Sequence, residues 1–196
     1  MTDIRREFRE LRDATDDARG SWLCRRFPDG VPSQWWTAML EAAETQCSPR
    51  RPLPAAERLA TWEFAARLLD LVPRFGGLSP CYVGYWRVRL AAIALRYSPP
   101  LDGLPPEFTP DAAVRYTLDH LPLTREKALD AAHRARQGRL HVPGEPITPG
   151  QRPPEESARL NDLRWVLPSL DWLVDHLRDD ALRRETRAWL DLVPRL

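Results

Sequence analysis

Apolar residues recur along the chain at the three- and four-residue spacings of helices, and no stretch shows the strict alternation of a half-buried strand. The first such stripe comprises Ile4, Phe8, Leu11 and Ala18. These positions predict one amphipathic helix over 2–20, with Thr2 as its N-cap and Gly20 just after its last turn. The pattern therefore indicates an all-α protein.

Proline, glycine and capping residues divide the rest of the chain into further helices. Serine, threonine and proline stand where helices commonly begin, and proline or glycine follows where they end. These signals predict a short segment at 21–27 and helices over 33–46, 54–72, 80–97, 110–121 and 124–137. The stretch 80–97 is apolar around most of its circumference, so we expect it to be the central helix of the fold.

An apolar seam with heptad spacing occupies the carboxy-terminal region from Pro154 onward. It comprises Leu160, Leu163, Leu167, Leu170, Val174, Leu177 and Ala181. Pro168 lies inside the seam and removes a helical hydrogen bond, so we expect one bent helix or two abutting helices there. The apolar phase shifts after Asp179-Asp180, which predicts a break and a new helix capped by an aspartate.

The elements together predict a single all-α domain over 1–196, a compact multi-helix bundle of about seven to nine helices with proline-rich connections. The chain has 196 residues, of which 43% are apolar, enough for one core of ordinary proportions. The segment 138–154 is rich in proline and glycine and predicts a long loop. A loop of that length without secondary structure commonly has a function or is disordered.

Composition narrows the classes of partner and compartment. The 29 basic and 28 acidic residues leave a net charge of +1, so overall charge gives no argument for nucleic acid or anionic membrane. The three cysteines, Cys24, Cys47 and Cys81, are odd in number and widely spaced. With no apolar leader and no apolar run long enough to cross a bilayer, we expect a cytoplasmic protein without membrane contact.

Catalytic and metal-binding patterns are missing from the sequence. The four histidines and three cysteines never stand at the close spacings of zinc ligands, and no P-loop, nucleophile elbow or dinucleotide fingerprint occurs. Glu41 and Glu44 are spaced as a carboxylate pair but fit a solvated helix surface. Cys81 starts a helix, where a thiolate is favoured, although a buried, inert thiol is the alternative. We therefore expect no enzymatic activity, no metal and no cofactor.

One face of the predicted helix 80–97 interleaves aromatic and arginine side chains. At about 100° per residue, this face carries Tyr82, Trp86, Arg89, Ile93, Arg96 and Tyr97. Such a surface favours a protein partner or nucleic acid. The alternative is that the rings complete the core while Arg89 and Arg96 reach carboxylates on other helices. Arg87 lies on the apolar side, so we expect a buried acidic partner, with Asp70 and Asp119 as candidates.

A second candidate surface lies beside the carboxy-terminal seam. Trp165, Trp172 and His176 form a strip next to the leucines rather than among them. An exposed strip would anchor an interface, whereas in a thicker bundle it would be ordinary core.

The leading hypothesis is a non-catalytic helical module, of regulatory, adaptor, chaperone or immunity type, that acts by binding a partner protein or a second copy of itself. The predicted partner-binding residues are Tyr82, Trp86, Arg89, Arg96, Trp165, Trp172 and His176. The alternative hypothesis is a nucleic-acid-associated helical subunit that uses the basic, aromatic helix around Arg89 and Arg96.

Overall fold

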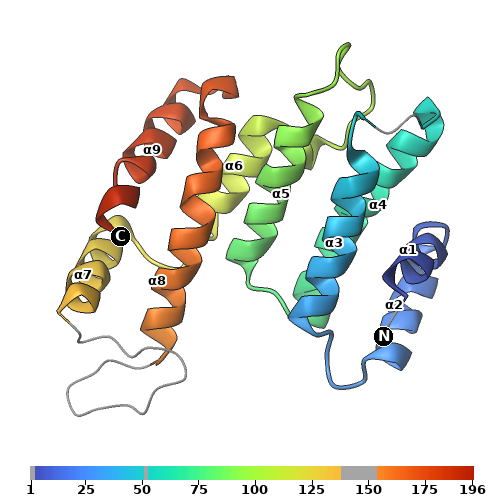
Figure 1. Ribbon diagram of the computed structural model, residues 1–196, viewed down its shortest axis with the longest axis horizontal. Helices are drawn as coiled ribbons and strands as arrows, with labels where there is room; N and C mark the ends of the chain where they lie inside the picture. Colours follow the sequence, from blue (N-terminus) through green and yellow to red (C-terminus); the bar gives the residue numbers. More distant parts are fainter. Residues whose placement is uncertain (1–2, 51–52, 138–153) are drawn as a thin grey trace.

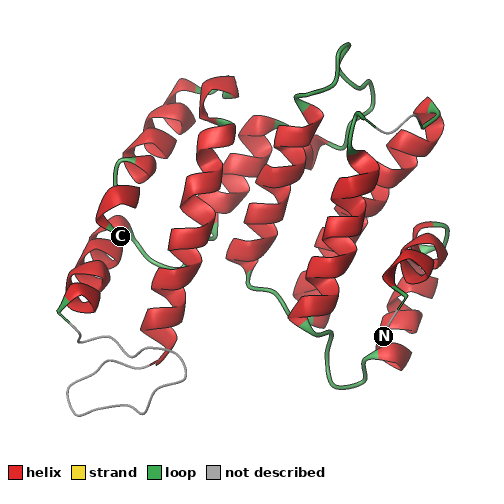
Figure 2. Cartoon of the chain, in the orientation of Figure 1, coloured by secondary structure: helices red, strands yellow, loops and turns green. Residues whose placement is uncertain are grey.

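A computed structural model describes residues 3–50, 53–137 and 154–196 of the chain. These residues form nine α-helices joined by loops and short 3-10 turns, and Figure 2 shows no strand among them. The α-helices are α1 (Ile4–Arg12), α2 (Asp16–Arg26), α3 (Ser33–Cys47), α4 (Ala55–Phe75), α5 (Pro80–Ala94), α6 (Pro110–Asp119), α7 (Arg125–Arg136), α8 (Pro154–Val166) and α9 (Asp180–Leu190). The 3-10 turns are η1 (Pro106–Phe108), η2 (Leu167–Trp172), η3 (Val174–His176) and η4 (Val193–Arg195). The predicted all-α bundle of seven to nine helices is confirmed.

Several helices begin at the capping residues that the sequence indicates. Ser79 accepts a hydrogen bond from the backbone N–H of Tyr82 at the start of α5. Thr124 caps α7 in the same way, and the side chain of Asp179 accepts two N–H groups at the start of α9. The predicted break and the new helix capped by an aspartate are thus confirmed. The Asp179 carboxylate satisfies N–H groups that have no partner within the helix.

The prediction of one helix over 2–20 is wrong, because α1 ends at Arg12 and α2 begins at Asp16. Thr15 caps α2, and Arg19 stabilises the corner between the helices. Its guanidinium donates to the carbonyl oxygens of Leu11 and Arg12 at 2.7 and 2.8 Å. These are carbonyls that the end of a helix leaves unpaired. Gly20, expected at the helix end, instead lies buried inside α2.

Helix α5 lies between the amino-terminal helices and the carboxy-terminal ones, as Figure 1 shows. Val83, Trp86 and Leu90 belong to a hydrophobic cluster with α1–α4. Val88 and Ala91 belong to a second cluster formed with α6–α9. The expectation that α5 is the central helix agrees with its place in both clusters, while its extent to Tyr97 is three residues too long.

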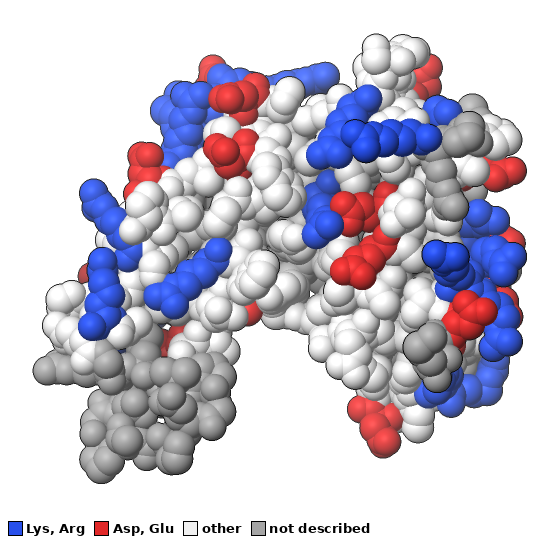
Figure 3. Space-filling model, in the orientation of Figure 1, with Lys and Arg blue, Asp and Glu red and all other residues white. Residues whose placement is uncertain are grey.

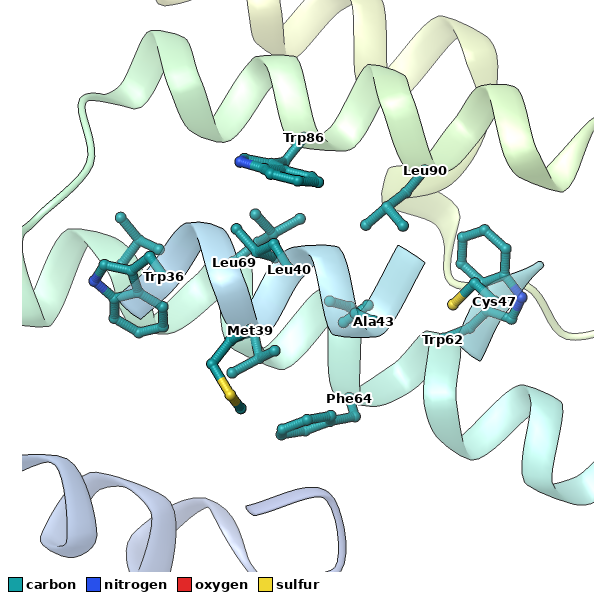
Figure 4. Packing of buried hydrophobic residues seen from close by; sticks show 14 of the residues in the cluster. Trp36, Met39, Leu40, Ala43, Cys47, Trp62, Phe64, Leu69, Trp86 and Leu90 are labelled. Carbon is teal, nitrogen blue, oxygen red and sulfur yellow. The ribbon is translucent and has the colours of Figure 1, made fainter. Parts of the chain in front are cut away.

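The amino-terminal cluster fixes which side of α5 is buried. Figure 4 shows Trp86 and Leu90 pointing from α5 toward Leu40 and Ala43 of α3. All four side chains are buried. Trp86 therefore belongs to the core and is not part of an exposed aromatic face.

Helices α5 and α6 approach closely at Gly84. A Cβ atom built on Gly84 would lie 2.7 Å from Oγ1 and 2.9 Å from Cα of Thr117. Only a residue without a side chain leaves room for α6 at this distance. This close approach holds the carboxy-terminal helices against α5.

The carboxy-terminal seam is buried from Leu160 to Leu177, whereas Ala181 is exposed. Its backbone is neither a bent α-helix nor two abutting ones, because 3-10 turns η2 and η3 follow α8. Pro168 cannot donate a hydrogen bond, and the hydroxyl of Ser169 donates to the carbonyl of Val166 at 2.7 Å. The tighter 3-10 winding changes the direction of the side chains that follow.

The long loop predicted at 138–154 lies outside the described residues, except that Pro154 begins α8. Nothing among the described helices has both the length and the apolar character needed to cross a bilayer. The prediction of a single domain stays a prediction, and the position of α5 in both hydrophobic clusters accords with it.

Candidate protein-binding groove

An open groove of about 740 Å³ runs along α5 between α3 and the η2–η3 segment. We call it the α5 groove. Its lining residues are Glu44, Tyr85, Arg89, Ala92, Ile93, Leu95, Arg96, Trp172 and His176. The groove therefore joins residues from both surfaces that the sequence singles out, although they are far apart in the chain.

Four of the predicted partner-binding residues line the α5 groove: Arg89, Arg96, Trp172 and His176. Trp172 is 48% exposed, and its ring centroid lies 6.5 Å from that of Tyr85. Tyr85 thus forms an aromatic wall together with Trp172.

The other three predicted residues lie elsewhere. Trp86 is buried against α3, which places it beneath the groove rather than in it. Tyr82 is partly buried, and Trp165 is 62% exposed but does not line the groove. Trp165 and Trp172 do not form the continuous strip that helical spacing predicts, because Trp165 lies in α8 and Trp172 lies in 3-10 turn η2. Both indoles are exposed, which agrees with the alternative of an exposed strip rather than ordinary core.

Of the five groove residues that the prediction did not include, Tyr85 and Glu44 are the two with polar side-chain groups. Tyr85 stands one turn before Arg89, and this i,i+4 spacing is the signal that could have found it. Glu44 lies on a different helix, so no local pattern predicts its contact with α5.

Arg89 is held by three neighbours rather than presented freely to a ligand. Its Nη1 donates to the Tyr85 hydroxyl at 2.8 Å, and its Nη2 lies 2.8 Å from Oε2 of Glu44. The guanidinium also sits over the Trp86 ring, 5.2 Å from its centroid. Partial burial disfavours the charge on Arg89, but the hydrogen bonds with Glu44 and Tyr85 outweigh it and raise the pKa above its ordinary value. Arg89 therefore positions Tyr85 and neutralises Glu44.

Arg96 is the cation in the α5 groove that forms no ion pair within the described part of the chain. A neighbouring depression of about 510 Å³ shares Glu44, Ile93 and Arg96 with the groove and extends to Arg50. Arg50 and Arg96 are both exposed. The end of the groove near α3 therefore carries positive charge that the described residues do not balance.

Arg87 lies on the side of α5 opposite the groove, and Asp70, one of its two expected acidic partners, does pair with it. Its Nη2 lies 3.4 Å from Oδ1 of Asp70, and its guanidinium is 4.1 Å from the centroid of the Tyr116 ring. The expectation of a buried carboxylate is wrong, because the Asp70 side chain is 49% exposed. Partial burial nevertheless raises the pKa of Asp70, and the nearby Arg87 offsets this only in part.

The alternative of a reactive Cys81 receives no support from its surroundings. Cys81 is buried, and burial, aided by the charge of Asp162, raises the pKa of its thiol to about 12. A thiol with that pKa stays protonated and unreactive at neutral pH. Within the described ranges, no three histidine, cysteine, aspartate or glutamate side chains come together as a metal site would need.

Charged side chains are unevenly distributed over one face of the molecule. Figure 3 shows the face on which α3, α5 and α8 lie side by side. Charged side chains gather over α3 and toward α9, and the surface between them is largely uncharged. The charged members of the groove lining are Glu44, Arg89 and Arg96, so charge lies within the groove as well as around it.

Comparisons of the chain with known family models, with curated proteins and with solved structures found no significant match. The functional proposal therefore rests on the structure of the groove.

Proposed function

We propose that the chain is a non-catalytic helical module, of regulatory, adaptor, chaperone or immunity type, and that it acts by binding a partner protein in the α5 groove. The proposal rests on one observation above all. Trp172 is 48% exposed in an open groove beside Tyr85, with Arg96 in the same lining.

Tryptophan, tyrosine and arginine, the residue types that dominate protein interfaces, occur together here: Trp172 and Arg96 are exposed and Tyr85 is partly buried. Leaving part of an indole in water gives up burial free energy of about 25 cal/mol per Å² of apolar surface. Other tryptophans of this chain are buried, so its core accommodates indole rings. A partner that covers Trp172 would recover the lost burial free energy, which is why such residues act as anchors.

The contacts of the basic residues support a protein partner over nucleic acid. Arg89 is paired with Glu44 and Arg87 with Asp70, so only Arg96 of the three arginines in the 85–97 stretch keeps its charge unpaired within the described residues. Nucleic-acid binding draws its affinity from several cations on successive phosphates. Arg96 and the neighbouring Arg50, beside the already paired Glu44, are too few to follow a run of phosphates.

Two further parts of the proposal concern compartment and chemistry. Cys47 and Cys81 are buried as free thiols, and Cys24 is exposed and also free, which fits the reducing cytoplasm. We assign no catalytic step to the chain, because the groove offers no activated nucleophile and no paired acid and base.

Affinity capture from native lysate with matched variants tests this function. Wild-type protein, Trp172→Ala and Trp165→Ala serve as baits of equal helicity, judged by circular dichroism. A partner protein that the wild type and Trp165→Ala retain, and that Trp172→Ala loses, supports the proposal. Equal retention by all three baits contradicts binding in the groove.

A further inference from the structure

The chemistry of the α5 groove also indicates what kind of segment fills it. We infer that the occupant is an amphipathic helix of the partner protein, with apolar side chains on Trp172 and Tyr85 and a carboxylate at the end near Arg96. This inference deepens the proposed function and rests on it.

Backbone hydrogen bonding favours a helical occupant. An extended peptide gains affinity by adding to a sheet edge, and none of the described residues is in a strand. The backbone groups of α5 bond within their own helix, so they cannot pair with an extended chain. A helix satisfies its own backbone and needs only side-chain contacts from the groove.

The length and floor of the groove fit a helix of two to three turns. From Tyr85 to Ile93 the lining residues of α5 span eight positions of helical rise, about 12 Å, and Leu95 and Arg96 follow in the turn after α5. Ala92 lies on this line, where a small side chain lets another helix approach closely. Trp172 and His176 lie on one side of the floor, and Glu44 lies on the other.

The charges that face the groove set the polarity of the occupant. They are Glu44, Arg89, Arg96 and His176. Glu44 is satisfied by Arg89 at 2.8 Å, which leaves Arg96, with Arg50 in the adjoining depression, without a carboxylate among the described residues. A partner carboxylate at this end would pair with Arg96, whereas a basic residue would meet like charge.

The same charges disfavour a second copy of this chain as the occupant. A two-fold dimer centred on the groove places the same patch on both sides of the interface. In such an interface each residue meets a residue of the same lining, and that lining has no free carboxylate, because Glu44 is already paired with Arg89, so neither Arg96 would be balanced.

A peptide selection against the full chain tests the inference. The probe is a phage-displayed library of helical peptides with a fixed apolar stripe and with polar positions varied among acidic, basic and neutral residues. Peptides are selected on the wild type and counter-selected on Trp172→Ala. We expect enrichment of aspartate or glutamate at one end of the stripe.

The best acidic peptide and its Lys-substituted version are then measured against Arg96→Glu. We expect the acidic peptide to lose about tenfold in affinity and the basic version to gain, because the reversal exchanges attraction and repulsion. Arg184→Glu, at an exposed position of α9, is the matched control and should change neither affinity.

The outcomes that overturn the inference are separate from those that overturn the proposed function. Selection of basic, neutral or proline-containing extended peptides refutes the acidic helix but leaves protein binding in the groove intact. A failure to select any peptide that distinguishes the wild type from Trp172→Ala refutes both. Self-association abolished by Trp172→Ala, or oligonucleotide binding abolished by Arg96→Glu, also overturns the inference.

Discussion

Replacing Gly84 with alanine tests the close packing of α5 on α6, which holds the carboxy-terminal helices and hence one wall of the groove. In an open helix interior, a glycine-to-alanine change stabilises by about 1 kcal/mol. At Gly84 the new Cβ would lie 2.7 and 2.9 Å from Oγ1 and Cα of Thr117. Because the second of these atoms belongs to the backbone of α6, a side-chain rotation cannot relieve the overlap, and the two helices must separate.

Overpacking of this kind costs about 1 to 3 kcal/mol. We therefore expect Gly84→Ala to lower the free energy of unfolding, and to lower Tm by roughly 2 to 4 °C for each kcal/mol at this chain length. The chain offers a matched control in Gly20→Ala, another buried helical glycine. There the new Cβ would lie 3.7 Å from Arg74 and 3.9 Å from Phe75, which are ordinary van der Waals distances. Gly20→Ala should stabilise the protein.

Urea unfolding followed by circular dichroism measures both variants. The difference in sign between the two substitutions is the informative result, because helix propensity alone predicts a gain for each. If Gly84→Ala is as stabilising as Gly20→Ala, the α5–α6 approach is not as close as we describe.

Three further predictions concern the corner, a half-buried carboxyl and nucleic acid. Arg19→Ala removes two hydrogen bonds to the end of α1 and should lower the free energy of unfolding in urea by about 2 to 4 kcal/mol. The control, Arg25→Ala at an exposed position, should lower it by less than about 0.5 kcal/mol. Equal losses for the two variants would contradict the capping role of Arg19. Burial raises the pKa of Asp162, so the ionised carboxylate destabilises the folded state at neutral pH. Asp162→Asn should therefore raise Tm at neutral pH, and it should not do so at a pH below the ordinary aspartate pKa. A lower Tm of Asp162→Asn at neutral pH would refute this. Single-stranded and duplex oligonucleotides should show no binding to the wild type at physiological salt in fluorescence anisotropy, and binding lost in Arg89→Glu/Arg96→Glu would favour the nucleic-acid alternative.

The helix starts could be predicted because their causes are local. Ser79, Thr124 and Asp179 each satisfy N–H groups two or three residues away, so the sequence around each cap contains the whole signal. The break between α1 and α2 has no proline or glycine. It depends on Arg19 reaching back to carbonyls seven and eight residues earlier, and helical periodicity alone carries no sign of such a contact.

The candidate site could be predicted only in part for the same reason. The aromatic and arginine content of α5 is visible in the sequence, but the assignment of Trp86 to an exposed face depends on what covers that face. Helix α3 covers it, and the partner of Arg89 is Glu44 on that helix. The approach of Trp172 to Tyr85 follows from the 3-10 turn η2, and the two residues are too far apart in the chain for any spacing rule.

The affinity of the captured partner for the wild type and for Trp172→Ala, measured together with the stability of each free protein, tests the central claim most directly. Because Trp172 is half exposed in the free chain, its truncation should leave the free energy of unfolding nearly unchanged. As an anchor it should cost at least about 2 kcal/mol of binding, which is roughly a thirtyfold rise in Kd. A loss of about 3 to 5 kcal/mol in stability, typical of a tryptophan in the core, with Kd unchanged, would contradict the account.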